Sequence, residues 1–298
     1  MTRHFLEVDD LTREELHVVL ELATNPLPPQ VLAGKGMALL FQKQSVRTRN
    51  SMEMAVTQLG GNPVTIRPDE VGLDVRESTE DVARTLGCFH AAIGARVFEH
   101  DKVERMAAVS RVPIVNMLSD QSHPLQALAD LLTVREEFGE LEGRVVSYIG
   151  DANNVARSLA IGCGMVGAQF QIASPAGYQF SDGDLDRIRA SGVEPMVTTD
   201  PGEAASGADV VYTDVWTSMG QEEESQQRLD AFAGYTIDAD MMARTKAEGI
   251  FLHCLPAHPG EECTREVLDG ASSRIWAQAE NRMHAARGLL IFLLQGAT

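Results

Sequence analysis

Arg144-Val-Val-Ser-Tyr-Ile-Gly-Asp-Ala-Asn-Asn-Val155 begins as an apolar run of strand length, passes through a polar turn, and continues as a helical pattern. A continuous apolar strand followed by a helix is typical of a parallel sheet whose connections are helical. Downstream the same order recurs, with apolar runs at Gln169–Ala173, Met196–Thr198, Asp209–Thr213 and Ile250–Leu255. We therefore expect this half of the chain to form a parallel sheet covered by helices on both faces.

The first half of the chain repeats the pattern. Its apolar runs are Met37–Phe41, Pro63–Ile66, Ala91–Ala95 and Val112–Leu118, and helical patterns begin near Thr48, Thr79, Lys102 and Pro124. Residues 139–143 separate the two series, and 298 residues suit two domains. The sequence predicts an α/β protein with two doubly wound parallel-sheet domains, residues 1–138 and 139–298, and a last helix at about 278–295.

Composition limits the partners that this chain can have. A formal net charge of −18 disfavours nucleic acid, which needs a basic surface, and also disfavours anionic membranes. No apolar run approaches the ~20 residues of a membrane helix, and the amino terminus lacks the apolar stretch of a signal peptide. Four cysteines are too few for a disulfide scaffold. We expect a cytoplasmic protein without a nucleic-acid or membrane partner.

Two motifs of the first half stand where ligands bind in such sheets, beyond the carboxyl ends of the strands. Ser45-Val46-Arg47-Thr48-Arg49 opens a helix after the first clear strand, and helix-start amides favour an anion such as phosphate. His123-Pro124-x-Gln126 opens a long helix after Val112–Leu118, where its imidazole and carboxamide can bind a carbonyl or amide group. A solvated, capped helix start and an ordinary helix entry are the respective alternatives.

Two further motifs follow strands of the second half. Gly150-Asp151-x-Asn153-Asn154 comes after the strand of the opening stretch, and Asp214-Val-Trp-x-Ser218-Met219-Gly220 comes after Asp209–Thr213. Their acceptors and donors suit a zwitterionic amino acid. Asn and Asp are also frequent in plain turns, so a structural role is the alternative for both.

The strand Ile250–Leu255 ends in His253-Cys254-Leu255-Pro256-Ala257. Its cysteine suits a hydrogen-bonding group, a nucleophile or a metal ligand. The spacing of His253, Cys254, His258 and Cys263 allows a zinc interpretation, although paired Cys-x2-Cys spacing is absent. Near the C-terminus, Glu280-Asn281-Arg282-x-His284 is either a site segment or a polar first turn of the last helix.

Gly162-x-Gly164-x-x-Gly167 matches the dinucleotide-binding pattern only as a string of letters. The strand that it should follow ends at Gly150, so these glycines lie at the far end of the intervening helix. They cannot present amide groups to a pyrophosphate at the start of that helix. We interpret them as a helix stop and predict no nicotinamide cofactor.

Taken in this order, and with Arg96 after a strand, the motifs resemble those of the aspartate/ornithine carbamoyltransferase family from about Phe5 to the C-terminus. The motifs around Asp214 and Cys254 are most similar to those of its ornithine-specific members. The resemblance implies transfer of the carbamoyl group of carbamoyl phosphate to the side-chain amine of L-ornithine, which gives L-citrulline and phosphate in arginine biosynthesis. It also implies a homotrimer, a carbamoyl-phosphate-binding domain at 1–138, an ornithine-binding domain at 139–298, and a last helix that packs back on the first domain.

The resemblance also assigns roles to individual residues. The phosphate would be bound by Ser45, Arg47, Thr48, Arg49 and the backbone amide of Val46. The carbamoyl group would be bound and polarised by Arg96, His123, Gln126 and Arg282. The two ends of ornithine that do not react would be held by Asn154, Asp214, Ser218 and Met219. Cys254 and the Leu255 backbone would complete the carbamoyl-phosphate site beside the reacting amine. Arg47, Arg96, His123, Gln126, Cys254 and Arg282 form the expected catalytic set, and no metal or organic cofactor is expected.

Three positions depart from the family pattern. Val46 stands where Thr is usual, Gly72 stands where a Gln commonly reaches a neighbouring subunit's site, and Pro259 stands where Arg is common. Two alternatives stay open. In the first, the chain is a related carbamoyltransferase whose acceptor is putrescine, an N-acylated ornithine or another amine. In the second, the chain is a non-catalytic binding member. The complete set Asp214, Ser218 and Met219 favours free ornithine, and the retained catalytic set argues against a non-catalytic member.

Overall fold

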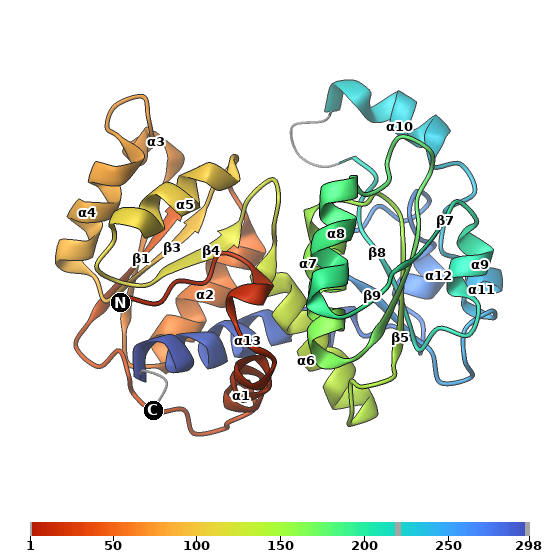
Figure 1. Ribbon diagram of the computed structural model, residues 1–298, viewed down its shortest axis with the longest axis horizontal. Coiled ribbons are helices and arrows are strands. Elements are labelled where there is room, and N and C mark those ends of the chain that lie inside the picture. Colours follow the sequence, from red (N-terminus) through yellow and green to blue (C-terminus); the bar gives the residue numbers. More distant parts are fainter. Residues whose placement is uncertain (1, 218–221, 296–298) are drawn as a thin grey trace. The chain divides into compact units, whose positions relative to one another are not determined.

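The computed structural model describes residues 2–217 and 222–295 (Figure 1). The chain divides into two compact units. Unit 1 comprises Met1–Leu132 and Glu280–Thr298, and unit 2 comprises Thr133–Ala279. Each unit contains its own parallel sheet, so the predicted fold class of two parallel-sheet α/β domains is confirmed.

The sheet of unit 1 has four parallel strands in the order β2-β1-β3-β4. They are β1 (Gly36–Phe41), β2 (Asn62–Ile66), β3 (Ala92–Arg96) and β4 (Ile114–Leu118). All of β3 and nearly all of β1 is buried, because helices cover both faces of the sheet. The predicted strands of this half all form, with bounds that differ by at most two residues.

Helices precede, connect and follow these strands. They are α1 (Arg13–Ala23), α2 (Val46–Gln58), α3 (Pro68–Val71), α4 (Thr79–Phe89), α5 (His100–Val109) and α6 (Pro124–Phe138), preceded by the 3-10 turn η1 (Val8–Asp10). α4 begins at the predicted Thr79 and is capped by Ser78, whose Oγ accepts from the Asp81 amide at 3.1 Å. α1 was not predicted, although Thr12 and Glu15 form a capping box at its start.

The last helix, α13 (Ile275–Gln295), packs against α1 in unit 1 (Figure 1). A methyl group at Gly288 would lie 2.5 Å from the Val19 carbonyl oxygen, so the two helix backbones are very close there. Arg287 strengthens the contact by donating to the carbonyl oxygens of Ala23 and Asn25 at 2.6 and 3.0 Å. The expectation that the last helix returns to the first domain is therefore confirmed.

Unit 2 has five parallel strands in the order β7-β6-β5-β8-β9. They are β5 (Val145–Ile149), β6 (Gln169–Ala173), β7 (Met196–Thr198), β8 (Val210–Thr213) and β9 (Ile250–His253). The helical elements are α7 (Asn154–Val166), α8 (Asp182–Ser191), α9 (Pro201–Ala205), η2 (Glu222–Glu224), α10 (Ser225–Ala231), α11 (Ala239–Met242) and α12 (Arg265–Leu268). Phe251 lies in the core of this unit and packs with Trp216 and Phe232.

The glycine-rich string of α7 is a helix stop, as predicted. Gly164 lies inside the helix, where a methyl group would meet Ser191 Oγ at 2.1 Å, so it allows α7 and α8 to approach closely. Gly167 ends the helix with φ of 75°, a left-handed conformation that glycine adopts at little cost. Neither glycine lies at the start of α7.

The strand order creates a switch point in each sheet. In unit 1 the chain runs outward from β1 to β2 on one side and from β3 to β4 on the other. In unit 2 the corresponding neighbours are β5 and β8. Loops that leave neighbouring strands in opposite directions open a crevice at their carboxyl ends, where ligands bind in such folds.

Within the described residues, no helix is both long and apolar enough to cross a membrane.

Candidate active site

The loop after β1 leads directly into the start of α2. Ser45 is the N-cap of α2, and its hydroxyl accepts from the Thr48 amide at 3.2 Å. Val46 is 77% exposed, so its side chain contributes little packing and its backbone stands at the open end of the helix. Arg49 is exposed and its Nε donates to Glu53 at 2.8 Å, one turn farther along α2. Thr48, by contrast, is buried.

Two buried guanidinium groups meet at Thr48. Arg96 ends β3 beside β1, and Arg282 extends from α13. Each is only 5% exposed, and they donate to Thr48 Oγ1 at 3.3 and 3.2 Å. Two like charges that share one neutral hydroxyl in a buried place create a strongly positive potential. Such a place favours a small anion, because an anion would reduce the repulsion between the two cations.

His123 lies within this positive field, at the start of α6. It is buried, and burial is the main reason why its pKa is well below the ordinary value of 6.5. The charges of Arg282 and Arg96, followed by those of Arg47 and Lys43, lower the pKa further. The imidazole is therefore neutral at pH 7, so it can donate one hydrogen bond and accept another. Lys43 was not among the predicted site residues.

Gln126 completes the cluster from the first turn of α6. Its side-chain oxygen accepts a hydrogen bond from Arg282. Its side-chain nitrogen donates to Asp130 Oδ1 at 2.7 Å, one turn later in the same helix. Asp130 is wholly buried and was missed in the sequence, although its i,i+4 spacing from Gln126 is a readable signal.

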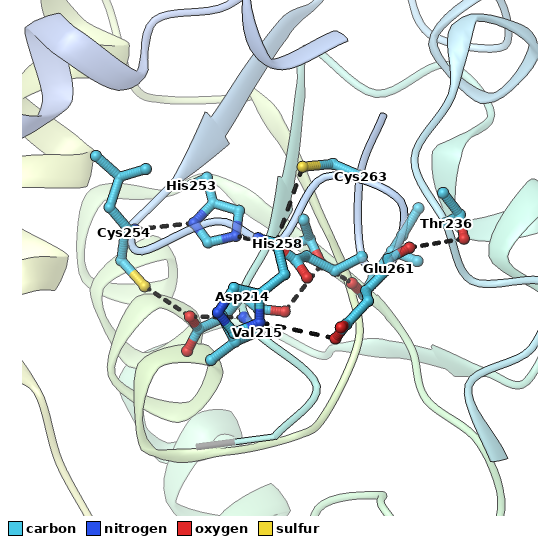
Figure 2. Close-up of polar contacts among 12 residues, drawn as sticks. Asp214, Val215, Thr236, His253, Cys254, His258, Glu261 and Cys263 are labelled. Atoms are coloured by element: carbon cyan, nitrogen blue, oxygen red, sulfur yellow. Dashed lines mark hydrogen bonds and ion pairs between the residues drawn. The ribbon is translucent and has the colours of Figure 1, made fainter. Parts of the chain in front are cut away.

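A second cluster lies at the switch point of unit 2 and is centred on Asp214 (Figure 2). Cys254 Sγ donates to Asp214 Oδ1 at 3.0 Å, and the Val215 amide donates to the same oxygen at 2.8 Å. Asn153 Nδ2 donates to Asp214 Oδ2 at 3.1 Å. Asn153 is also the N-cap of α7, so the end of β5, the end of β8 and the loop after β9 are joined around one carboxylate. Asn153 was within a predicted motif but was not assigned a role.

The segment that carries Cys254 is held from behind by a buried pair (Figure 2). His253 Nδ1 accepts from the Leu255 amide at 2.8 Å, so Nε2 carries the proton and faces Glu262 Oε1 at 3.1 Å. Leu255 has φ of 63°, an uncommon conformation for a branched side chain. Glu262 is a second acidic residue that could not be singled out from the sequence, because eight residues of loop lie between it and His253.

The remaining predicted residues of unit 2 lie at the start of α7, in the loop after β9 or outside the described residues. Asn154 is the first residue of α7 and is partly buried. Ser218 and Met219 lie outside the described residues. Burial, together with the charge of Glu262, raises the pKa of Cys263 to about 12, which keeps it a neutral thiol.

The zinc interpretation required four side chains to converge. Among the described residues, His253 and Cys254 group with Asp214, whereas His258 groups with Glu261 and Glu262. Cys263 belongs to neither group, so the four residues of that interpretation do not form one cluster.

Known proteins match both units of this chain. Residues 3–136 match the carbamoyl-P binding domain of aspartate/ornithine carbamoyltransferases, and residues 142–293 match the Asp/Orn binding domain. The chain belongs to the aspartate/ornithine carbamoyltransferase family. Within this family, the chain is 49% identical over 308 residues to the ornithine carbamoyltransferase of Acidothermus cellulolyticus, covering 100% of this chain and 98% of the relative.

Solved structures of the family agree with this membership. The ornithine carbamoyltransferase of Pyrococcus furiosus has a TM-score of 0.94 at 40% identity and covers 99% of this chain and 98% of its own. That of Thermus thermophilus has a TM-score of 0.90 at 43% identity, with 99% of each chain covered. The resemblance stated from the strand-end motifs is therefore confirmed, and both the fold and the family extend over nearly the whole chain.

Proposed function

We propose that this protein is an ornithine carbamoyltransferase, which transfers the carbamoyl group of carbamoyl phosphate to the side-chain amine of L-ornithine. The observation that carries the proposal is the pair of buried guanidinium groups at Thr48, together with the neutral imidazole of His123. This cluster suits an anion with a polarisable carbonyl group. Relatives that match the full length of the chain bear the same name.

In this proposal residues 1–138 bind carbamoyl phosphate and residues 139–298 bind ornithine, with α13 returning to the first domain. The phosphate lies at the start of α2, where the amides of its first turn, the Ser45 and Thr48 side chains, Arg47 and Arg49 supply donors. Arg49 must then leave or share its ion pair with Glu53, so we give it a smaller role than Arg47.

The carbamoyl group lies among Arg96, His123, Gln126 and Arg282. Guanidinium and imidazole N–H groups donate to its carbonyl oxygen and draw electron density from the carbon. When the neutral amine of ornithine attacks that carbon, negative charge grows on the carbonyl oxygen and on the departing phosphate. Donors that already point at these positions stabilise the transition state more than the ground state.

Ornithine is held by unit 2 through Asn154, Asp214, Ser218 and Met219, with Cys254 and the Leu255 backbone beside its reacting amine. Asp214 offers a carboxylate to the α-ammonium group, and its present bonds from Cys254 and Asn153 fix the direction of its oxygens. Cys254 donates a hydrogen bond in this arrangement, so we assign it a binding role and not that of a covalent nucleophile.

The test is product formation from isotope-labelled carbamoyl phosphate with a panel of amines, read by mass. L-Ornithine should exceed putrescine and N-acetyl-ornithine in kcat/KM by at least about tenfold. Each of these lacks one of the two α-groups and leaves a buried partner unpaired at about 1–3 kcal/mol. Lysine, one methylene longer, should be a poor acceptor because its amine is misplaced. Putrescine or an acyl-ornithine as the best substrate would overturn the choice of acceptor.

We further propose a cytoplasmic homotrimer that acts in arginine biosynthesis. Because one chain has a mass of 32.4 kDa, light scattering should give a mass of about 97 kDa for the trimer. Gly72 ends α3 with φ of 50°, a conformation that a Gln at this position would adopt only with strain. A fully active monomer at working concentration would rule out sites shared between subunits.

A further inference from the structure

The orientation of the Gln126 side-chain amide is determined by two neighbours of opposite chemistry. The oxygen and nitrogen of a glutamine side chain have nearly the same shape, so only hydrogen-bond partners tell them apart. Arg282 has donors alone, so the atom that it contacts must be the oxygen. The atom 2.7 Å from Asp130 Oδ1 is the nitrogen, which donates to that carboxyl oxygen. Both neighbours therefore require the same orientation.

A bound ligand would affect the contacts of these two neighbours with Gln126 differently. Arg282 belongs to the anion-binding cluster, and a bound anion competes for its N–H groups. Asp130 is wholly buried one turn behind Gln126 on α6, where a ligand in front of the guanidinium pair does not replace it. When the ligand binds, Asp130 is thus the partner that keeps the Gln126 nitrogen turned away and its oxygen turned toward the cluster.

We propose that Asp130 is a positioning residue which fixes Gln126 as a hydrogen-bond acceptor and thereby selects a carbamoyl group over an acetyl group. This inference rests on the proposed function. Carbamoyl phosphate and acetyl phosphate carry the same phosphate and carbonyl groups and differ only in NH2 against CH3. A side-chain oxygen held in place accepts from the NH2 group, whereas a methyl group offers that oxygen no hydrogen-bond donor. A glutamine that is free to turn presents either its oxygen or its NH2 group and loses this distinction.

The experiment measures the dissociation constants of carbamoyl phosphate, acetyl phosphate and inorganic phosphate by calorimetry without ornithine. Wild type should prefer carbamoyl phosphate to acetyl phosphate by at least about tenfold, because a site built for an N–H donor rejects the analogue that lacks it. Asp130→Leu removes the acceptor and should reduce this preference by at least about tenfold. Asp130→Asn keeps an oxygen acceptor and should keep the preference within about threefold. Inorganic phosphate should bind wild type and all variants within about threefold.

Thr133→Val is the matched control, since it also replaces a buried polar side chain on α6. It should leave the preference unchanged. A folded Asp130→Leu protein with the wild-type preference would overturn the proposal, and so would an equal loss of affinity for all three anions, which would indicate a purely structural role. If Asp130→Leu fails to fold, two other results would each overturn the proposal. One is a wild-type preference for carbamoyl phosphate over acetyl phosphate below about threefold. The other is the loss of this preference in Asp130→Asn.

Binding without ornithine separates this inference from the proposed function. An enzyme that prefers another amine would still discriminate between the two acyl phosphates. A protein that binds neither carbamoyl phosphate nor acetyl phosphate would refute both.

Discussion

Replacing His123 with asparagine should make the protein less sensitive to acid. Burial and four nearby cations hold the pKa of His123 well below 6.5. The unfolded chain takes up a proton on this side chain near pH 6.5, whereas the folded chain does so only at much lower pH. Stability rises with pH wherever the unfolded state binds more protons. His123 therefore destabilises the fold progressively as the pH falls below 6.5, down to its folded pKa.

The size of the effect follows from one proton. Within that window each pH unit changes the free energy of unfolding by about 1.4 kcal/mol, so the total between pH 7.5 and 5.5 is also about 1.4 kcal/mol. For a domain of about 150–250 residues, 1.4 kcal/mol corresponds to a shift of roughly 3–6 °C in Tm. His123→Asn carries no titrating group, so its Tm should fall less than the wild-type Tm by this amount.

The assay is differential scanning calorimetry of both proteins at pH 7.5 and 5.5 in a phosphate-free buffer. Phosphate is omitted because an anion bound to the folded state would raise Tm and mask the proton effect. His17→Asn, at an exposed position of α1, is the matched control and should behave like wild type. An identical pH dependence of Tm in His123→Asn and wild type would refute the conclusion that His123 is held neutral.

Three other substitutions, the last with a matched control, test separate parts of the structure. Arg47→Ala should weaken transition-state binding by about 2–4 kcal/mol and lower kcat/KM accordingly. A loss of kcat/KM below tenfold would show that this guanidinium is peripheral. Cys254→Ser should keep measurable activity, since a hydroxyl can also donate to Asp214, whereas a carbamoyl-cysteine adduct detected by mass spectrometry would indicate a nucleophile. Gly288→Ala should lower the free energy of unfolding by at least about 2 kcal/mol, because the new methyl group meets the backbone of α1. In Gly183→Ala, on an exposed part of α8, the methyl group meets only one atom at 3.9 Å, so denaturant unfolding should show no loss of stability.

The positions of strands were readable from the sequence because their residues are mostly apolar, even in β2 and β7, which are only partly buried. Gln169–Ala173 and Met196–Thr198 form at the predicted bounds, and α6 begins at the predicted Pro124. α1 was missed although its apolar residues lie on one face and a capping box stands at Thr12, both of which are readable helix signals. Strand β9 ends at His253, two residues before the predicted end, since the Leu255 amide turns back to the His253 ring.

The site was readable only where a signal stands next to a strand or a helix start. Ser45, His123 and Asp214 follow strands and Arg96 ends one, so their place at the carboxyl ends of the strands could be predicted. The meeting of Thr48 with Arg282 could not, because 234 residues separate them and only the return of α13 brings them together. In the same way, the support of His253 by Glu262 depends on a loop whose path has no periodic signal.

What the sequence could not supply at all is the direction of individual polar groups, and that direction decides the chemistry of the unit 1 cluster. A glutamine beside an arginine can be read in any sequence, but whether it offers its oxygen or its nitrogen depends on the group behind it. Asp130 supplies that group from the next turn of the same helix, and the low pKa of His123 makes the neighbouring imidazole neutral. The neutral state of the imidazole and the orientation of the amide beside the two cations therefore depend on burial and on hydrogen-bond partners, and not on residue types. Variants that keep the residue types but change these partners, such as Asp130→Asn against Asp130→Leu, are therefore more informative than alanine substitutions within the cluster.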